Sequence, residues 1–109
     1  MNITIKRTLD VTPSLEIYIE EKFLPLAKLV KAFDKDGSLE LRLEVSRTSN
    51  HHRKGEDIFM AGADLRLPGK IVRGEASASD IRKAIDGARD ILREEIEKYK
   101  AKHTEASRK

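Results

Sequence analysis

Basic side chains recur along one flank of the last apolar-patterned stretch of the chain, residues 79–102. If this stretch is a helix with about 100° between neighbours, four bases fall within roughly 40° of one another. They are Arg82, Arg89, Arg93 and Lys100. A row of guanidinium and ammonium groups can contact successive phosphates, which makes this flank a candidate RNA or DNA surface. Because Asp86 and Asp90 run alongside, a partly self-neutralised helix surface in water is the alternative.

A second basic cluster occupies the polar segment 48–55, which contains no acid. Its members are His51, His52, Arg53 and Lys54. Adjacent histidines diverge in an extended segment, and neither a cysteine nor a nearby carboxylate pair completes a zinc-type site. We therefore expect no metal ion and no cofactor here. The segment is either a basic patch for a nucleic acid or a solvated loop, and its chemistry leaves both interpretations open.

The carboxylates are arranged as on a solvated helix rather than as a catalytic pair. They alternate with bases at helical spacings, which can form ion pairs along a helix. The spacing pairs Arg82 with Asp86, Arg93 with Glu97 and Glu94 with Lys98. No glycine-rich phosphate loop follows a strand pattern. The sequence therefore predicts that the protein is not an enzyme and takes no small-molecule substrate.

The basic flank must be positioned by a helix whose other side is apolar. In residues 79–102 the apolar side chains recur at helical spacing, and either Ser77 or Ser79 is the expected N-cap. The apolar positions are Ile81, Ala84, Ile85, Ala88, Leu92, Ile96 and Tyr99. This pattern predicts one long helix that buries its apolar side against a core.

An earlier helix is predicted to begin at Thr12 and Pro13, because a hydroxyl N-cap followed by proline is typical of helix starts. Pro25 should kink or divide this helix near Lys22. Lys22 lies within the apolar arc. Either its stem packs while its amine reaches water, or it is a basic group aimed out of a groove between helices.

Four strands are predicted, at residues 2–7, 39–46, 58–67 and 70–76, with a tight turn at Pro68 and Gly69. The element order is β-α-β-β-β-α, an α+β fold. The last three strands should form an antiparallel meander, and the first can pair parallel after a helical crossover. The expected architecture is a two-layer sandwich, a four-stranded mixed sheet with two helices packed on one face and water on the other.

The composition fits one small, heavily charged domain. The chain has 109 residues, of which 38% are charged, and a net charge of +3. It has no cysteine, no apolar start typical of a signal peptide, and no apolar run near the ~18 residues that span a membrane. We expect a single cytoplasmic domain, residues 1–102, that is monomeric when free and does not bind membranes. A disordered basic tail, residues 103–109, should follow it.

The order of particular residues resembles the ribosome hibernation-promoting factor and ribosome-associated inhibitor family over nearly all of residues 2–102. The most specific parts are residues 51–55 followed by Phe59 and Ala61, and the Ala84-Ile85-Asp86 triplet. Further matches are Asn2, Ile3, Thr12, Pro13, Tyr18, Lys22, Leu26, Lys28, Pro68, Gly69, Arg73, Asp80, Leu92 and residues 98–102.

The resemblance implies a domain of the same order that binds 16S rRNA of the small ribosomal subunit, in the channel for mRNA and tRNA. Such a protein keeps ribosomes inactive during stress or stationary phase, without catalysis. The resemblance, together with the helical spacing of Arg82, Arg89 and Arg93, gives the bases expected to contact rRNA. They are Lys22, Lys28, His51, His52, Arg53, Lys54, Arg82, Arg89, Arg93, Lys98, Lys100 and Lys102. At Arg82 and Arg93 this chain departs from the family, which often has an aromatic residue and an acid there. A general double-stranded-RNA-binding module and a domain that oligomerises through an exposed sheet edge are the alternatives.

Overall fold

A computed structural model describes residues 1–7, 11–49 and 57–107 of the chain. The described elements are β1 (Asn2–Arg7), α1 (Pro13–Phe23), α2 (Leu26–Leu29), the 3₁₀ helix η1 (Lys31–Phe33), β2 (Glu40–Ser49), β3 (Asp57–Leu67), β4 (Lys70–Ala78) and α3 (Ile81–Ser107). The strands form one sheet in the order β1-β2-β3-β4, in which only the β1–β2 pair is parallel. The predicted α+β fold is therefore confirmed.

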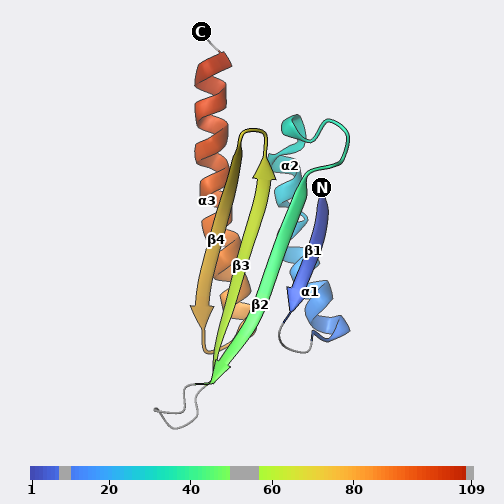
Figure 1. Cartoon of the computed structure of the whole chain (residues 1–109), viewed down its shortest axis with the longest axis vertical. Helices are drawn as coiled ribbons and strands as arrows, with labels where there is room; N and C mark the ends of the chain where they lie inside the picture. Colours follow the sequence, from blue (N-terminus) through green and yellow to red (C-terminus); the bar gives the residue numbers. More distant parts are fainter. Residues whose placement is uncertain (8–10, 50–56, 108–109) are drawn as a thin grey trace.

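The sheet has one buried face and one wet face, as strand alternation requires. Leu41, Leu43 and Val45 of β2 point into the core, and Ala61 and Leu65 of β3 do the same. Figure 1 shows the helices on one side of the sheet, with α3 behind β4 and α1 and α2 behind β1 and β2. The predicted wet face is confirmed by its exposed charged side chains, Arg42, Glu44, Arg73 and Glu75.

The start and the break of the first helix follow from local chemistry. The Thr12 hydroxyl oxygen accepts a hydrogen bond from the Leu15 N–H at 3.1 Å, and Pro13 is the first helical residue. Pro25 has no N–H to continue the helical ladder, so α1 ends at Phe23 and α2 begins at Leu26. The predicted division near Lys22 is confirmed.

The long helix differs from its predicted bounds at both ends. The Asp80 carboxylate accepts the Arg82 N–H at 2.8 Å and caps α3. Ser77 is paired with Met60 in β4, and α3 begins at Ile81, directly after Asp80, so the predicted cap at Ser77 or Ser79 is wrong. At the other end α3 continues to Ser107, where the sequence predicted a disordered tail from residue 103.

Contacts of His103 give a physical reason for the longer helix. Its Nδ1 lies 3.1 Å from the Tyr99 carbonyl oxygen, and its ring packs on the Tyr99 ring with centroids 3.9 Å apart. The Phe33 ring meets the His103 ring edge-on at 5.5 Å. These contacts add packing beyond residue 102 that the apolar pattern of the sequence does not contain.

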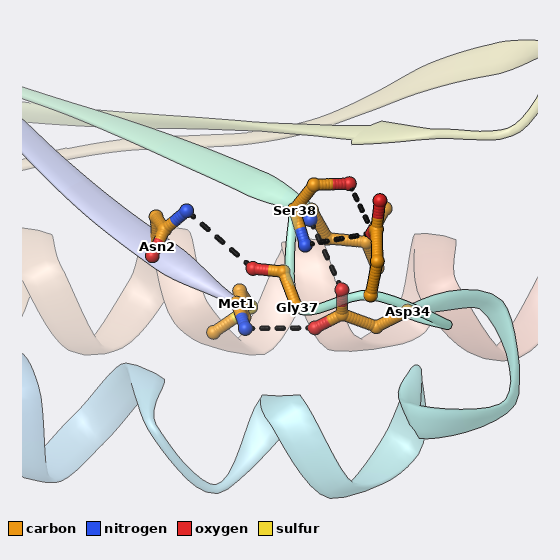
Figure 2. A network of polar contacts seen from close by, with 7 residues as sticks. Met1, Asn2, Asp34, Gly37 and Ser38 are labelled. Carbon is orange, nitrogen blue, oxygen red and sulfur yellow. Dashed lines mark hydrogen bonds and ion pairs between the residues drawn. The ribbon is translucent and has the colours of Figure 1, made fainter.

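A hydrogen-bonded network joins the start of β1 to the turn before β2 (Figure 2). The Met1 ammonium donates to Asp34 Oδ2 at 2.7 Å, while Asp34 Oδ1 accepts the Leu39 N–H at 3.1 Å. The Asn2 N–H donates to the Leu39 carbonyl at 2.7 Å. The hydrogen bond from the ammonium group holds the pKa of Asp34 below its usual value. The network helps to set the parallel register in which Asn2 lies opposite Glu40.

The close contact between α3 and β4 depends on small residues. A Cβ added at Gly74 would clash with the Ala88 carbonyl oxygen and lie 2.5 Å from the Leu92 backbone nitrogen. A Cβ added at Gly87 would lie 2.7 Å from that of Ala76. Backbone therefore meets backbone at this point, and the position of α3 over the sheet depends on Gly74.

Candidate nucleic-acid interface

The basic flank of α3 lies on the side that meets α1. Arg82 Nη2 lies 3.3 Å from Ser14 Oγ, and the Tyr18 hydroxyl donates to Asp86 Oδ1 at 2.6 Å. Farther along, the rings of Phe33 and Tyr99 meet edge-on at 5.1 Å. Because these contacts advance together in both segments, the two helices run in the same direction (Figure 1). Basic residues of the two helices therefore gather along a shared line.

Tyr18 is the centre of the contact between α1 and α3. The Arg82 guanidinium lies 4.7 Å from the centroid of its ring, and Lys22 Nζ lies 5.3 Å from it. Lys22 Nζ also lies 3.8 Å from Asp86 Oδ1. Asp86 therefore pairs with Lys22 and Tyr18, and the predicted pair of Arg82 with Asp86 is not formed. The Lys22 amine lies between α1 and α3, beside Tyr18 and Asp86, and 31% of the side chain is exposed.

The other bases on this flank have weak or no ionic partners. Arg93 Nε lies 3.4 Å from Glu97, the pair that the spacing predicted, and Arg89 Nε lies 2.8 Å from Asp90, a pair that was not predicted. Exposed pairs of this kind contribute about 0–1 kcal/mol, so a phosphate can replace the carboxylate at small cost. Among the described residues, Lys100 of this flank has no ion pair, and the exposed Lys28 of α2 has none either. The flank is thus available to an anionic partner over several turns.

The electrostatic setting of Tyr18 predicts its behaviour on titration. Burial of the hydroxyl, the hydrogen bond to Asp86 and the negative charge of Asp86 raise the pKa of Tyr18 from 10.0 to about 12, although Arg82 and Arg89 oppose the shift. Because the folded state favours the neutral phenol, this stabilisation is complete below pH 10 and is lost as the pH rises towards 12. Phenolate absorbance should show the Tyr18 transition near pH 12.

Two variants assign that transition. Tyr18→Phe should remove it, and Asp86→Asn should move it to lower pH because the carboxylate charge is gone. The pKa of Tyr99, the other tyrosine, is also raised by burial, so the Tyr18→Phe difference spectrum is needed. A Tyr18 transition at an ordinary tyrosine pKa would contradict the contact with Asp86.

The structure separates bases that the sequence placed together. Lys98 and Lys102 are one turn apart and line a groove beside the β3–β4 turn, on the side of α3 away from the flank that carries Lys100. Lys98 pairs with Glu95 at 3.4 Å rather than with Glu94. The predicted set at residues 98–102 therefore belongs to two different surfaces.

The predicted loop residues His51, His52, Arg53 and Lys54 lie outside the described residues. The strand ends on either side of that segment, Ser49 and Asp57, are paired with each other. They lie at the end of the sheet where Phe59 is opposite Ala78. The β3–β4 turn and the C-terminal turns of α3 are at the opposite end (Figure 1). These strand ends are thus remote from Lys98 and Lys102.

Two features of the groove beside the β3–β4 turn were not predicted from the sequence. Lys70, the first residue of β4, lines the same groove as Lys98 and Lys102. The rings of Phe33, Tyr99 and His103 form a cluster beside this groove, which no pattern in the sequence predicted. The sequence does show a lysine directly after the Pro68-Gly69 turn. It does not show that α3 lies close to that turn, so Lys70 could not be grouped with Lys98 and Lys102.

Over the described ranges, the structure contains no group of three or more His, Cys, Asp or Glu side chains placed to hold a metal ion. In the same ranges, no helix is long and apolar enough to cross a membrane.

Comparison with known proteins gives concordant results. Residues 1–104 match the family model described as "Sigma 54 modulation protein / S30EA ribosomal protein". The chain is 30% identical over 97 residues to a ribosome hibernation promotion factor of Deinococcus radiodurans, which covers 89% of this chain and 47% of the relative. It is 30% identical over 102 residues to a ribosome hibernation promoting factor of Acinetobacter guillouiae, and this match covers 92% of this chain and 88% of the relative. The chain thus spans about half of the first relative and most of the second.

Solved structures share the fold. A ribosomal subunit interface protein from Coxiella burnetii superposes with a TM-score of 0.67 at 20% identity, covering 93% of this chain and 99% of that one. The N-terminal domain of Protein Y from Thermus thermophilus superposes with a TM-score of 0.61 at 29% identity, and the match covers 91% of this chain and 99% of that one.

Proposed function

The chain belongs to the family described as "Sigma 54 modulation protein / S30EA ribosomal protein", and from this membership we propose that it is a ribosome-associated translation inhibitor. It binds 16S rRNA of the small subunit in the channel that holds mRNA and tRNA. By occupying that channel during stress or stationary phase, it keeps ribosomes inactive. Residues 1–102 supply the ribosome-binding domain.

One structural observation carries this proposal, the line of bases along the paired helices. Lys22, Arg82 and Arg89 surround the Tyr18–Asp86 contact, and Arg93 and Lys100 continue the line along α3. Phosphate contacts by such a row position a protein on RNA without reading bases. By resemblance, Lys28 on α2 and the loop residues 51–54 are also assigned to rRNA contacts, and so are Lys98 and Lys102, which lie on the other side of α3.

The mechanism is occlusion rather than chemistry. The relatives are hibernation factors by name and the family is not one of enzymes, which agrees with the absence of a catalytic pattern in the sequence. Asp86 has a positioning role in this proposal. It holds Lys22 and Tyr18 against α3, so the bases of two helices keep a fixed spacing.

Sedimentation with ribosomes across a salt series tests the proposal. At low salt the protein should pellet with 30S and 70S particles. If about five phosphates are contacted, raising the salt from roughly 50 to 200 mM should weaken binding on the order of 100-fold, because each contact releases counterions.

The comparison ligand is a random duplex RNA under the same conditions. Failure to pellet at low salt contradicts the proposal. Equal affinity for the duplex and for ribosomes favours a general double-stranded-RNA-binding module instead. A mass that rises with protein concentration, with no affinity for either ligand, favours an oligomerising domain.

A further inference from the structure

An open groove of about 630 Å³ lies between the β3–β4 turn and the C-terminal half of α3. It is lined on one side by Pro68, Gly69 and Lys70, and on the other by side chains of α3 that include Lys98 and Lys102. Figure 1 shows that α3 continues past the β3–β4 turn, beyond the end of the sheet. The groove is on the side of α3 away from the basic flank that meets α1.

The floor of the groove is held in place by buried contacts. The Tyr99 side chain is 4% exposed, and its hydroxyl donates to the Pro68 carbonyl oxygen at 2.7 Å. Phe33 packs edge-on against the Tyr99 ring, and the exposed His103 ring packs on it with centroids 3.9 Å apart. These contacts tie the helix to the turn. The groove is therefore a formed surface with an aromatic wall.

The charges that line the groove are mostly positive. Lys70, Lys98 and Lys102 face one carboxylate, Glu95, which lies 3.4 Å from Lys98 Nζ. Within the part of the chain that the structure describes, neither Lys70 nor Lys102 has an ion pair. A ligand with phosphate groups would thus meet two ammonium groups not already neutralised there.

Aromatic walls beside cations suit one class of ligand. Proteins bind single-stranded nucleic acids at surfaces where aromatic rings stack on the nucleobases and basic side chains contact the phosphates. A volume of about 630 Å³ is within the range of small-ligand sites. We propose that this groove binds a nucleotide unit of single-stranded RNA, with phosphate at Lys70 and Lys102 and the nucleobase against the exposed ring of His103, which the buried Tyr99 ring supports from below. The site is separate from the basic flank and does not depend on binding to ribosomes.

Fluorescence anisotropy with a labelled single-stranded RNA hexamer tests the site in the full chain. Lys70→Glu/Lys102→Glu should weaken hexamer binding at least tenfold, because ammonium–phosphate attraction becomes repulsion. The matched control, Lys6→Glu/Lys83→Glu, makes the same change in net charge at exposed residues outside the groove, and should change affinity less than twofold. Far-UV circular dichroism of both variants checks that the fold is kept.

His103→Ala tests the base-stacking part. It should weaken hexamer binding several-fold while leaving competition by inorganic phosphate unchanged. Competition by AMP distinguishes a free nucleotide from an RNA strand as the source of the ligand, and tighter binding of the hexamer supports the strand. An equal loss in the groove and control variants, or an unchanged affinity in the groove variant or in His103→Ala, overturns the proposal. Because the probe is free RNA, this outcome is independent of whether the protein pellets with ribosomes.

Discussion

Simultaneous replacement of Arg89, Arg93 and Lys100 by Glu is expected to abolish pelleting with ribosomes at low salt. Each change removes a cation from the flank beside α1 and, in the proposed interface, adds an anion next to rRNA phosphates. The loss should be at least about 100-fold in affinity, and the residual binding should have a salt slope lower by about three. Arg82 is left unchanged because its contact with the Tyr18 ring also supports the packing of α1 on α3.

A matched variant distinguishes this surface from a general charge effect. Lys6, Arg66 and Lys35 are exposed bases on other parts of the surface, and their replacement by Glu changes the net charge equally. This control should pellet almost as the unchanged protein does. The two variants should have the same far-UV circular dichroism, since the exposed pairs of Arg89 and Arg93 contribute little to folding. Undiminished pelleting of the Arg89, Arg93 and Lys100 variant would remove this flank from the interface.

Gly74→Ala is expected to be the most destabilising single methyl addition in the described sheet. The added carbon would meet the Ala88 carbonyl oxygen and the Leu92 backbone nitrogen, which lies 2.5 Å away. Backbone atoms of a packed helix cannot move independently, so α3 must shift from β4. The free energy of unfolding should fall by about 3 kcal/mol, the upper end of the usual cost of overpacking. Urea denaturation followed by circular dichroism measures this change.

Gly62→Ala is the matched control, because it adds the same methyl group to a neighbouring strand. The nearest atoms there belong to the Arg73 guanidinium, whose Cζ lies 3.0 Å away, and this flexible group can swing aside. The ion pairs of Arg73 with Asp64 and Glu75 are exposed, so the control should lose less than about 1 kcal/mol. Equal midpoints for the two variants would contradict the close approach of α3 to β4 at Gly74.

Much of the fold could be predicted because its information is local. Alternating burial in residues 39–46 identifies a strand without knowledge of its neighbour, since successive side chains of a strand point to opposite faces. The hydroxyl of Thr12 and the ring of Pro13 act on the adjacent turn of helix, so the start of α1 was readable from two residues. The cap of α3 was predicted at Ser77 or Ser79, because either hydroxyl can accept an N–H of the first turn. β4 extends to Ala78, which excludes Ser77, and α3 begins at Ile81, which leaves Asp80 as the cap.

The candidate site was only partly predictable, because its charges are distributed between elements. Helical spacing placed Arg82, Arg89, Arg93 and Lys100 on one flank of α3, and the structure keeps them together on the side that meets α1. The same spacing could not assign Asp86 to Lys22 and Tyr18 rather than to Arg82. That choice depends on where α1 lies, 68 residues earlier in the sequence at Tyr18.

By itself, the sequence determined the element order, the buried faces and the family to which the chain belongs. These depend on periodicity and on residues close together in the chain. The tertiary structure alone decided that Lys70 joins Lys98 and Lys102, and that Phe33, Tyr99 and His103 form one cluster. The physical reason is that a helical pattern gives only the direction in which each side chain leaves the helix axis. The neighbour in that direction depends on how closely Gly74 lets the helix approach the sheet.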